Sequence, residues 1–276
     1  MVSGDVPEGL SLCRSAGWNQ TRRDWDLFLN LSPEGCRVAV DDEGRVVGTV
    51  ATIRYEDRFS WIGMVLVNPA MQRQGIGIQL LRESLQILSA EDTIKLDATP
   101  AGRKIYVQLD FVDEYPIRRL VLSKFSTAQL PATKAVLVQR PDLSAILEMD
   151  NNVFGASRRR VLEWLLEGGK QFAFMVHDRG AVKGYCFGRT GFNFTHIGPV
   201  ISNDVATAIE LVSAALKNSK NTAVVLDAPH PASEWARWLD SIGFREERTL
   251  MRMYRGSNQY PGMPEKQFAI LGPELG

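Results

Sequence analysis

The sequence predicts an α/β (α+β) protein made of two tandem domains, each with a mixed, mostly antiparallel central sheet flanked by helices. Three observations support this prediction. The chain has 276 residues, more than one ordinary domain needs. One order of elements occurs twice along it, and matching glycines in the two copies keep a nearly constant separation. Apolar residues make up 45% and charged residues 23%, the balance of a globular protein.

The first copy begins with a helical pattern over residues 18–31, where apolar side chains recur at helical spacing before the stop signal SPEG. The alternating stretch 37–55 turns at its Asp-Glu-Gly and predicts an antiparallel hairpin. Residues 61–67 suit a buried strand, a helical pattern starts at Gly75, and residues 93–98 predict another strand.

The second copy repeats this order, with a helix over 158–169 and a hairpin over 172–188. Gly44 and Gly180 are 136 residues apart, Gly63 and Gly198 are 135 apart, and Asp97 and Asp227 are 130 apart. The second copy is therefore shorter just where the first has QRQGIG. We expect its helix to start from a plain cap at Asn203 or Asp204.

Arg140-Pro141 interrupts a strand-like run before a new helical pattern, because the residue before proline is disfavoured in helix. We therefore expect an N-terminal domain over 1–138, a C-terminal domain over 141–256, and an extended tail over 257–276. The tail is rich in Gly and Pro, which excludes a long regular element.

Several classes of protein do not fit the composition. The formal net charge is zero, with 32 basic and 32 acidic residues, so nothing indicates a nucleic acid or membrane partner. The opening carries no leader pattern and no window is long and apolar enough for a membrane span, which predicts a cytoplasmic protein. The arginines of SRRR, residues 157–160, are expected on the solvated face of a helix.

The cysteines and histidines are scattered, without the close pairs that a structural zinc site or a disulfide framework shows. We expect no metal. The residues concerned are Cys13, Cys36, Cys186, His177, His196 and His230.

The most informative segment is VNPAMQRQGIG, residues 67–77, where a predicted strand enters a glycine turn that opens a helix. Such a turn presents unpaired backbone N–H groups and the positive end of the helix dipole, which together bind anions. A side chain at Gly75 or Gly77 would block the approach of a phosphate, and Gln72, Arg73 and Gln74 add donors. The spacing matches neither the P-loop nor the dinucleotide fingerprint, because position 80 is Leu80.

The pattern V-x-P-x-x-Q-x-x-G-x-G, with Val67, Pro69, Gln72, Gly75 and Gly77, resembles the coenzyme-A-binding motif of the GNAT acetyltransferase superfamily. The resemblance implies acetyl-CoA as co-substrate. It places the backbone of one strand beside the pantetheine arm and the loop amides around the pyrophosphate. The residues so implied are Met64, Val65, Leu66, Val67, Gln72, Arg73, Gln74, Gly75, Ile76 and Gly77. Arg73 departs from the family, where many members carry glycine.

The segment KIYVQLDF resembles another part of the family pattern and places Tyr106 where a general acid toward the coenzyme A thiolate often stands. Asp110 departs from the usual glycine. The second copy has Leu239 at the tyrosine position and restores the glycine as Gly243. It lacks both the loop and the acid, so we expect a degenerate copy. The whole chain resembles a bacterial tandem-GNAT subgroup described as YitH/HolE-like.

By this resemblance, the first copy would pass an acetyl group from acetyl-CoA to an amine of a small molecule or peptide, by direct attack in a ternary complex. Asp97, Asp24 and Glu56 are candidates for the general base, though each also suits a cap or a solvated charge. A non-catalytic acyl-CoA sensor and a purely structural duplication remain alternatives. The sequence identifies neither the acceptor nor whether the chain forms a homodimer.

Overall fold

The computed structural model describes residues 1–219, 223–229 and 233–276. His230, one of the histidines considered above, lies outside the described residues. The first part of the chain forms α1 (Val6–Ser15), α2 (Arg22–Leu31), β1 (Arg37–Val40), β2 (Val46–Tyr55), β3 (Phe59–Val67), α3 (Ile76–Ile87), β4 (Thr93–Ala98), α4 (Pro100–Val107) and β5 (Val112–Leu122). The second part forms β6 (Val136–Leu137), α5 (Leu143–Phe154), α6 (Arg159–Gly169), β7 (Phe174–Asp178), β8 (Ala181–Thr190), β9 (Thr195–Ser202), α7 (Val205–Lys217), β10 (Val224–Pro229), α8 (Ser233–Ser241), β11 (Arg245–Gly256) and β12 (Gln267–Ala269).

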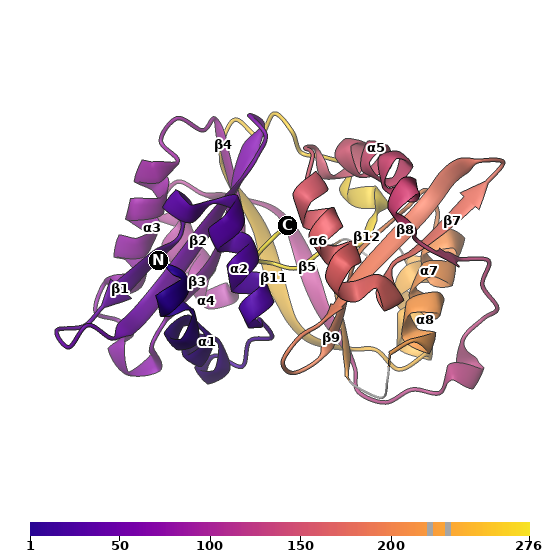
Figure 1. The fold of residues 1–276 in the computed structure, drawn as a ribbon, viewed down its shortest axis with the longest axis horizontal. Helices are drawn as coiled ribbons and strands as arrows, with labels where there is room; N and C mark the ends of the chain where they lie inside the picture. The colour runs from indigo at the N-terminus through magenta and orange to yellow at the C-terminus, as the bar shows by residue number, and fades with distance from the viewer. Residues whose placement is uncertain (220–222, 230–232) are drawn as a thin grey trace.

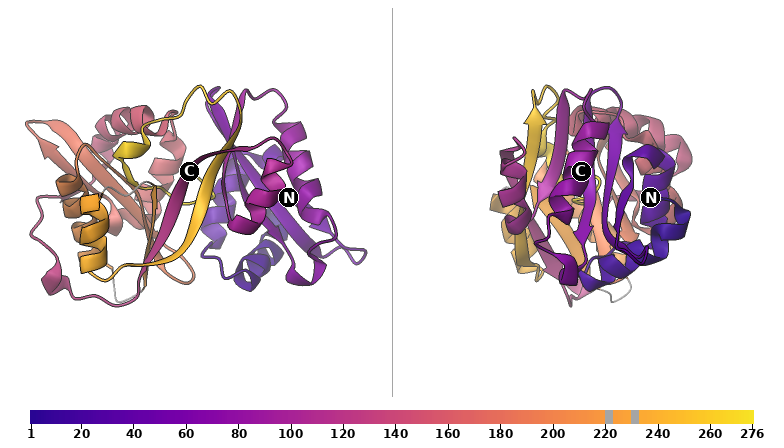
Figure 2. Two further views of the ribbon diagram at one scale, coloured as in Figure 1. Left: turned by 180° about the vertical axis from the view of Figure 1, so that it is seen from behind. Right: turned by 90° about the vertical axis from the view of Figure 1, so that its left-hand side faces the viewer.

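One mixed, mostly antiparallel sheet runs through the whole protein in the order β1-β2-β3-β4-β11-β5-β10-β9-β8-β7-β6, with β12 added beside β9 (Figure 1). Helices lie on both faces of the sheet (Figure 2). This arrangement confirms the predicted fold class and the repeated order of elements. Helix α1 is an exception, since no helix was expected before residue 18; it buries Val6, Leu12 and Cys13 against the core.

The two copies exchange their last strands. Strand β11, from the second part of the chain, pairs with β4 and β5, whereas β5, from the first part, pairs with β10. Both strands lie side by side in the middle of the protein (Figure 1). The exchange joins the copies into one sheet. The domain boundary near residue 140 remains a prediction from the sequence.

Each copy contains a place where two parallel strands separate. Strand β3 pairs with β4 through its residues Ser60 and Trp61, and β9 pairs with β10 through its residues Thr195 and His196. Beyond these residues the strands diverge. In the second copy β12 fills the gap, pairing with β9 and continuing through an Ile270 N–H that donates to a β10 carbonyl at 2.8 Å. In the first copy no described strand fills the corresponding gap.

Two backbone positions explain departures from the expected pattern. Asp110 has φ +63°, and Gly243, its counterpart in the second copy, has φ +103°. The left-handed conformation favours glycine, but aspartate tolerates it better than most residues do. Asp110 therefore preserves the turn after α4, and its presence does not shift the position of Tyr106.

The expectation for the SRRR segment is wrong at Arg158. This side chain is buried and donates to both Asp150 oxygens, to Oδ1 from Nη2 at 2.8 Å. Its Nη1 donates to the Gly276 carbonyl at 2.9 Å. A charge can be buried only when it is paired, and here the partner comes from the preceding helix α5.

Candidate active site

A groove runs from the glycine turn along the diverging edge of β3 to helix α4. We call it the glycine groove. Its walls are the outer half of β3, the loop before α3, the first turns of α3, and one side of α4. Of the predicted residues, those that line it are Val65, Val67, Gln72, Arg73, Gly75, Ile76, Gly77 and Tyr106.

The other three predicted residues lie elsewhere. Met64 has φ +55° at the point where β3 bends and lines the neighbouring pocket. Leu66 turns its side chain into the hydrophobic core. Gln74 is exposed, with its amide near the Met71 sulfur. The family resemblance concerns main-chain groups at these positions, so the side-chain placement does not conflict with the predicted cofactor contacts.

The N-terminus of α3 is open toward the glycine groove. Gly75 caps it with φ +86° and offers no side-chain hydrogen bond, so the first amides of the helix have no capping side chain. A Cβ built on Gly75 meets no atom within 4 Å, and one on Gly77 meets only Val67, at 3.5 Å. In the second copy the carboxylate of Asp204 caps α7 by accepting from the Thr207 N–H at 2.8 Å. The expected contrast between the copies is therefore present.

Tyr106 stands where the glycine groove meets a second pocket, and it lines both. Only 9% of the residue is exposed, and burial raises its pKa to about 12. The hydroxyl therefore keeps its proton at neutral pH. Within the described part of the chain no group accepts a hydrogen bond from it, which leaves it free for a ligand. Leu239, its counterpart, is buried in the core of the second copy.

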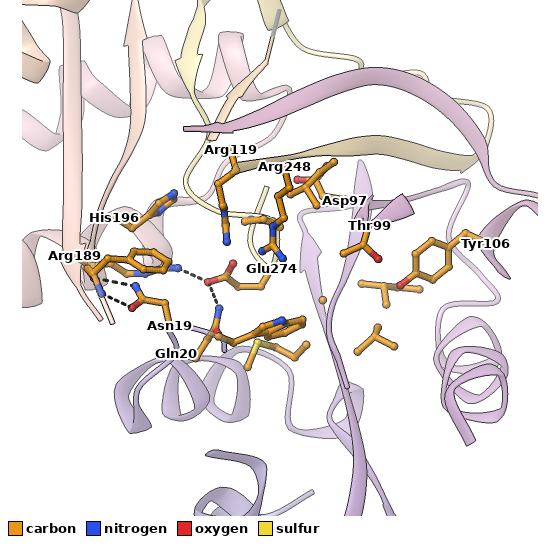
Figure 3. Close-up of a pocket in the computed structure, with 18 residues that line it drawn as sticks. Asn19, Gln20, Asp97, Thr99, Tyr106, Arg119, Arg189, His196, Arg248 and Glu274 are labelled. Atoms are coloured by element: carbon orange, nitrogen blue, oxygen red, sulfur yellow. Dashed lines mark hydrogen bonds and ion pairs between the residues drawn. The ribbon is translucent and has the colours of Figure 1, made fainter. Parts of the chain in front are cut away.

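The second pocket lies between the two copies, and we call it the central pocket (Figure 3). The loop before α2, strand β3 and the end of β4 supply one side of it. The other side comes from β8, β9 and the two exchanged strands. Its charged and titratable side chains are Asp97, Tyr106, Arg119, Arg189, His196, Arg248 and Glu274.

The three candidates for the general base lie in different surroundings. Asp24 caps α2 by accepting from the Thr21 N–H at 2.7 Å, and Glu56 accepts from the Ser157 N–H at 2.9 Å. Neither lines the central pocket. Asp97 does line it, but Arg252 donates to both of its oxygens at 2.9 Å.

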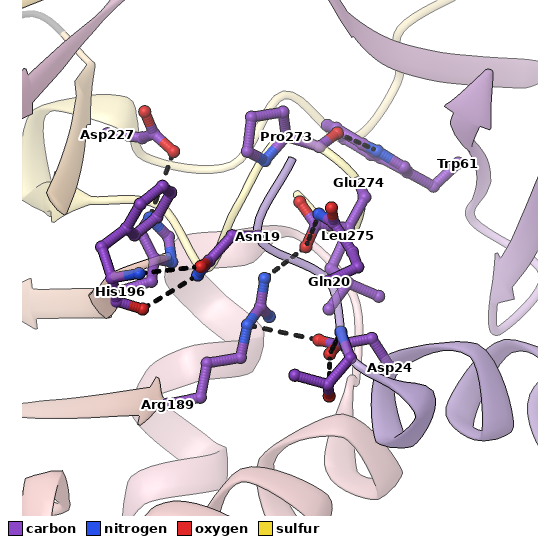
Figure 4. A network of polar contacts seen from close by, with 12 residues as sticks. Asn19, Gln20, Asp24, Trp61, Arg189, His196, Asp227, Pro273, Glu274 and Leu275 are labelled. Atoms are coloured by element: carbon purple, nitrogen blue, oxygen red, sulfur yellow. Dashed lines mark hydrogen bonds and ion pairs between the residues drawn. The ribbon is translucent and has the colours of Figure 1, made fainter. Parts of the chain in front are cut away.

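Glu274 is a central residue that sequence reasoning missed. The tail crosses between the copies, where the Pro273 carbonyl accepts from Trp61 at 3.0 Å (Figure 4). The Leu275 carbonyl accepts from Tyr55 at 2.7 Å. These bonds hold the Glu274 carboxylate in the pocket. Gly63 makes the crossing feasible, because a Cβ there would lie 2.6 Å from the Glu274 carbonyl oxygen.

The Glu274 carboxylate is ionised and only partly engaged. Its Oε1 accepts from Gln20 at 3.0 Å and from Arg189. Burial alone would raise the pKa of this carboxyl, but Arg189 and Gln20 more than compensate and lower it. The only sequence signal was the tail's Gly and Pro content, which does not reveal where the tail packs.

His196 is held by Asp227, with Nε2 and Oδ2 3.1 Å apart. The same carboxylate receives two hydrogen bonds from Arg119, both at 2.7 Å. Burial alone would raise the pKa of Asp227, but Arg119 and His196 hold it well below its usual range. The second copy therefore lacks the glycine loop but still supplies polar groups to the central pocket.

The described ranges contain no cluster of three His, Cys, Asp or Glu side chains that could hold a metal ion. The absence of metal from the reaction stays a prediction. The three cysteines are buried and unpaired, and burial raises the pKa of the Cys36 thiol to about 11. Among the described helices none is long and apolar enough to cross a membrane.

Comparisons with known proteins agree with this geometry. Residues 8–111 match the family model described as Acetyltransferase (GNAT) family, and residues 146–269 match one described as Acetyltransferase (GNAT) domain. The uncharacterized N-acetyltransferase YitH of Bacillus subtilis is 24% identical over 243 residues, which cover 86% of this chain and 84% of YitH.

Two solved structures share the fold. One, described as an acetyltransferase of Pyrococcus horikoshii, has a TM-score of 0.84 at 24% identity and covers 100% of this chain and 94% of its own. A tandem GNAT protein from the clavulanic acid biosynthesis pathway has a TM-score of 0.62 at 15% identity, covering 91% of this chain and 94% of its own. The chain therefore belongs to the GNAT family of N-acetyltransferases and carries two GNAT domains in tandem.

Proposed function

We propose that the first copy binds acetyl-CoA in the glycine groove and that an amine in the central pocket attacks the acetyl group directly. The observation that carries this proposal is the position of Tyr106, which lines both cavities. Acetyl-CoA supplies an activated acyl group as a thioester. The cytoplasmic location and any homodimer remain predictions.

The residues of the glycine groove fit the co-substrate. The uncapped amides of α3 suit the pyrophosphate, and the space beside Gly75 and Gly77 lets phosphate oxygens reach the backbone. Beyond Trp61 no described strand pairs with β3 on the side facing β4, so the backbone groups of this edge suit the amide-containing pantetheine arm. Arg73, with φ +63°, adds a cation at the rim.

Two side chains can move the protons of the reaction. The Tyr106 hydroxyl gives its proton to the departing sulfur as the carbon–sulfur bond breaks. Glu274 accepts the proton that the attacking nitrogen loses, because its Oε2 makes no hydrogen bond to another described residue. Both oxygens of Asp97 are engaged by Arg252, so Glu274 is the better base.

The experiment that tests this function compares the parent with Tyr106→Phe in an assay of coenzyme A release over a panel of amines. We expect turnover to fall about 100-fold, within the range typical of a lost general acid, while acetyl-CoA affinity is retained. Equal activity of both proteins would remove Tyr106 from the mechanism. Cofactor binding without turnover of any amine would identify the sensor instead.

Glu274→Gln gives a second test. The lowered pKa of Glu274 predicts that the parent stays active into mildly acidic pH, because the carboxylate remains ionised there. The variant should lose turnover over the whole range, without a large change in acetyl-CoA affinity. If it keeps the parent's pH profile and rate, Glu274 only supports the pocket.

A further inference from the structure

Two arginines face each other across the exchanged strands. Arg248 of β11 and Arg119 of β5 are direct cross-strand partners. Like charges in this position destabilise a sheet. The register of β11 shifts between Glu246 and Arg248, so a bulge at Glu247 turns the Arg248 side chain toward the central pocket. Figure 3 shows both side chains extending into the same part of that pocket.

The two arginines have unequal partners. Asp227 binds Arg119 through both carboxylate oxygens. The carboxylate beside Arg248 is that of Glu247, 4.0 Å from its Nε; 55% of the Glu247 side chain and 37% of the Arg248 side chain are exposed. Burial and the neighbouring Arg119 charge lower the pKa of Arg248. A buried anion would relieve both effects.

A third arginine of the central pocket has an excess of carboxylate around it. Arg189 contacts two carboxylates, Asp24 at 3.4 Å and Glu274. One guanidinium thus contacts two negative charges, whereas Asp227 pairs with Arg119 and Arg248 pairs only with the exposed Glu247 among the described residues. Glu274 therefore has a buried counter-charge, whereas Arg248 has no buried ion-pair partner among the described residues.

Unpartnered polar atoms mark the same surfaces. Four buried side-chain atoms among the pocket residues have no hydrogen-bond partner in the described structure: Gln20 Oε1, Arg189 Nη1, His196 Nδ1 and Arg248 Nε. His196 is only 2% exposed. Buried polar atoms are nearly always hydrogen-bonded, so a polar ligand or water in the central pocket would satisfy these four.

From these observations we infer that the acceptor is a small amine that also carries a carboxylate, as an amino acid does, with Arg248 and Arg119 binding the carboxylate. The inference rests on the proposed function. Glu274 in the same pocket is then available to the amino group, which must reach the thioester at Tyr106. One uncompensated guanidinium matches a single negative charge better than the nearly double charge of a phosphate monoester.

The test measures coenzyme A release with three matched sets of acceptors: amino acids, the corresponding amino-acid amides, and phosphate-bearing amines such as phosphoethanolamine. We expect at least one amino acid to exceed its amide by about 100-fold in kcat/KM, the size of a lost charged hydrogen bond. Arg248→Gln should reduce that preference to a few-fold, mainly through KM. Arg118→Gln, on the same sheet but paired with exposed Glu246, is the matched control and should leave it unchanged.

The outcomes separate the two proposals. If amides or phosphate-bearing amines are the better acceptors, the proposed acetyl transfer stands and the carboxylate inference falls. If none of these sets is acetylated but another amine of the wider panel is, only the inference falls; if no amine of the panel is acetylated either, both fall. An unchanged preference in Arg248→Gln would also overturn the inference.

A measurement without substrate gives an independent check. Because the two arginines repel each other in the free protein, Arg248→Gln should raise the melting temperature by about 1–3 °C. The amino acid that serves as the best acceptor should raise the melting temperature of the parent by binding to it. The variant should show no such rise. A variant that melts lower than the parent would show that Arg248 stabilises the fold and is not held for a ligand.

Discussion

Arg252 of β11 lies directly opposite Asp97 of β4 and donates to both of its carboxylate oxygens at 2.9 Å. Arg119 of β5 stands in the same relation to Asp227 of β10, at 2.7 Å. In each case the arginine comes from an exchanged strand and the aspartate from the copy that receives it. The two buried pairs therefore join the copies at equivalent positions.

We predict that Asp97→Asn destabilises the protein by about 3–5 kcal/mol, because it leaves the Arg252 guanidinium buried without its counter-charge. Urea unfolding at neutral pH measures this change in free energy. Arg118→Gln, which breaks an exposed pair, should cost less than about 1 kcal/mol. Equal costs would mean that the buried pair does not stabilise the strand exchange.

The Arg119–Asp227 pair makes a prediction about pH. The folded pKa of Asp227 is depressed, so its contribution is complete above the unfolded value of about 3.9 and declines as pH falls below it. The stability gap between the parent and Asp227→Asn should therefore be constant from pH 7 to 5 and narrow below pH 4. Unfolding curves across this range test it; a gap that widens in acid would contradict the assigned direction.

Gly77→Glu should abolish cofactor binding, because its carboxylate would enter the phosphate end of the glycine groove. We expect the affinity for acetyl-CoA to fall at least about 100-fold, or about 2.8 kcal/mol. Gly77→Ala is the matched control for folding, since its Cβ meets only Val67 at an ordinary 3.5 Å, and its single methyl group should weaken binding less than the glutamate does. Thermal shift with acetyl-CoA measures both, and full binding by the glutamate variant would place the phosphates elsewhere.

Gly198→Ala should detach the tail from the second copy. The added Cβ would lie 1.9 Å from the Ile270 carbonyl oxygen, closer than any such contact allows. We expect a loss of about 1–3 kcal/mol and faster proteolysis within residues 257–276. Gly4→Ala, where a Cβ meets nothing within 4 Å, is the control. Unchanged protease resistance would show that the tail is not held by this contact.

The sequence predicted most elements because their signals are local. Alternation, helical spacing and glycine turns depend on a few neighbouring residues, and the hairpins and helix α3 occur where expected. The glycine turn was predictable for the same reason, since Gly75 caps α3 within a single turn; that the turn binds the cofactor stays a proposal.

The central pocket was not predictable, because it depends on contacts between distant segments. The exchange of β5 and β11 brings Arg119 and Arg248 together. The tail brings Glu274 back to Gln20 only through long-range hydrogen bonds with β3 and β2. Arg158 shows the same limit, since only the packed structure provides its partner Asp150.

The most direct test of this account is isothermal titration of the intact protein with acetyl-CoA. One site per chain is predicted, because the first copy leaves its strand gap open and the second fills its gap with β12. Two sites per chain would contradict the degenerate second copy, and no binding would contradict the assignment of the glycine groove.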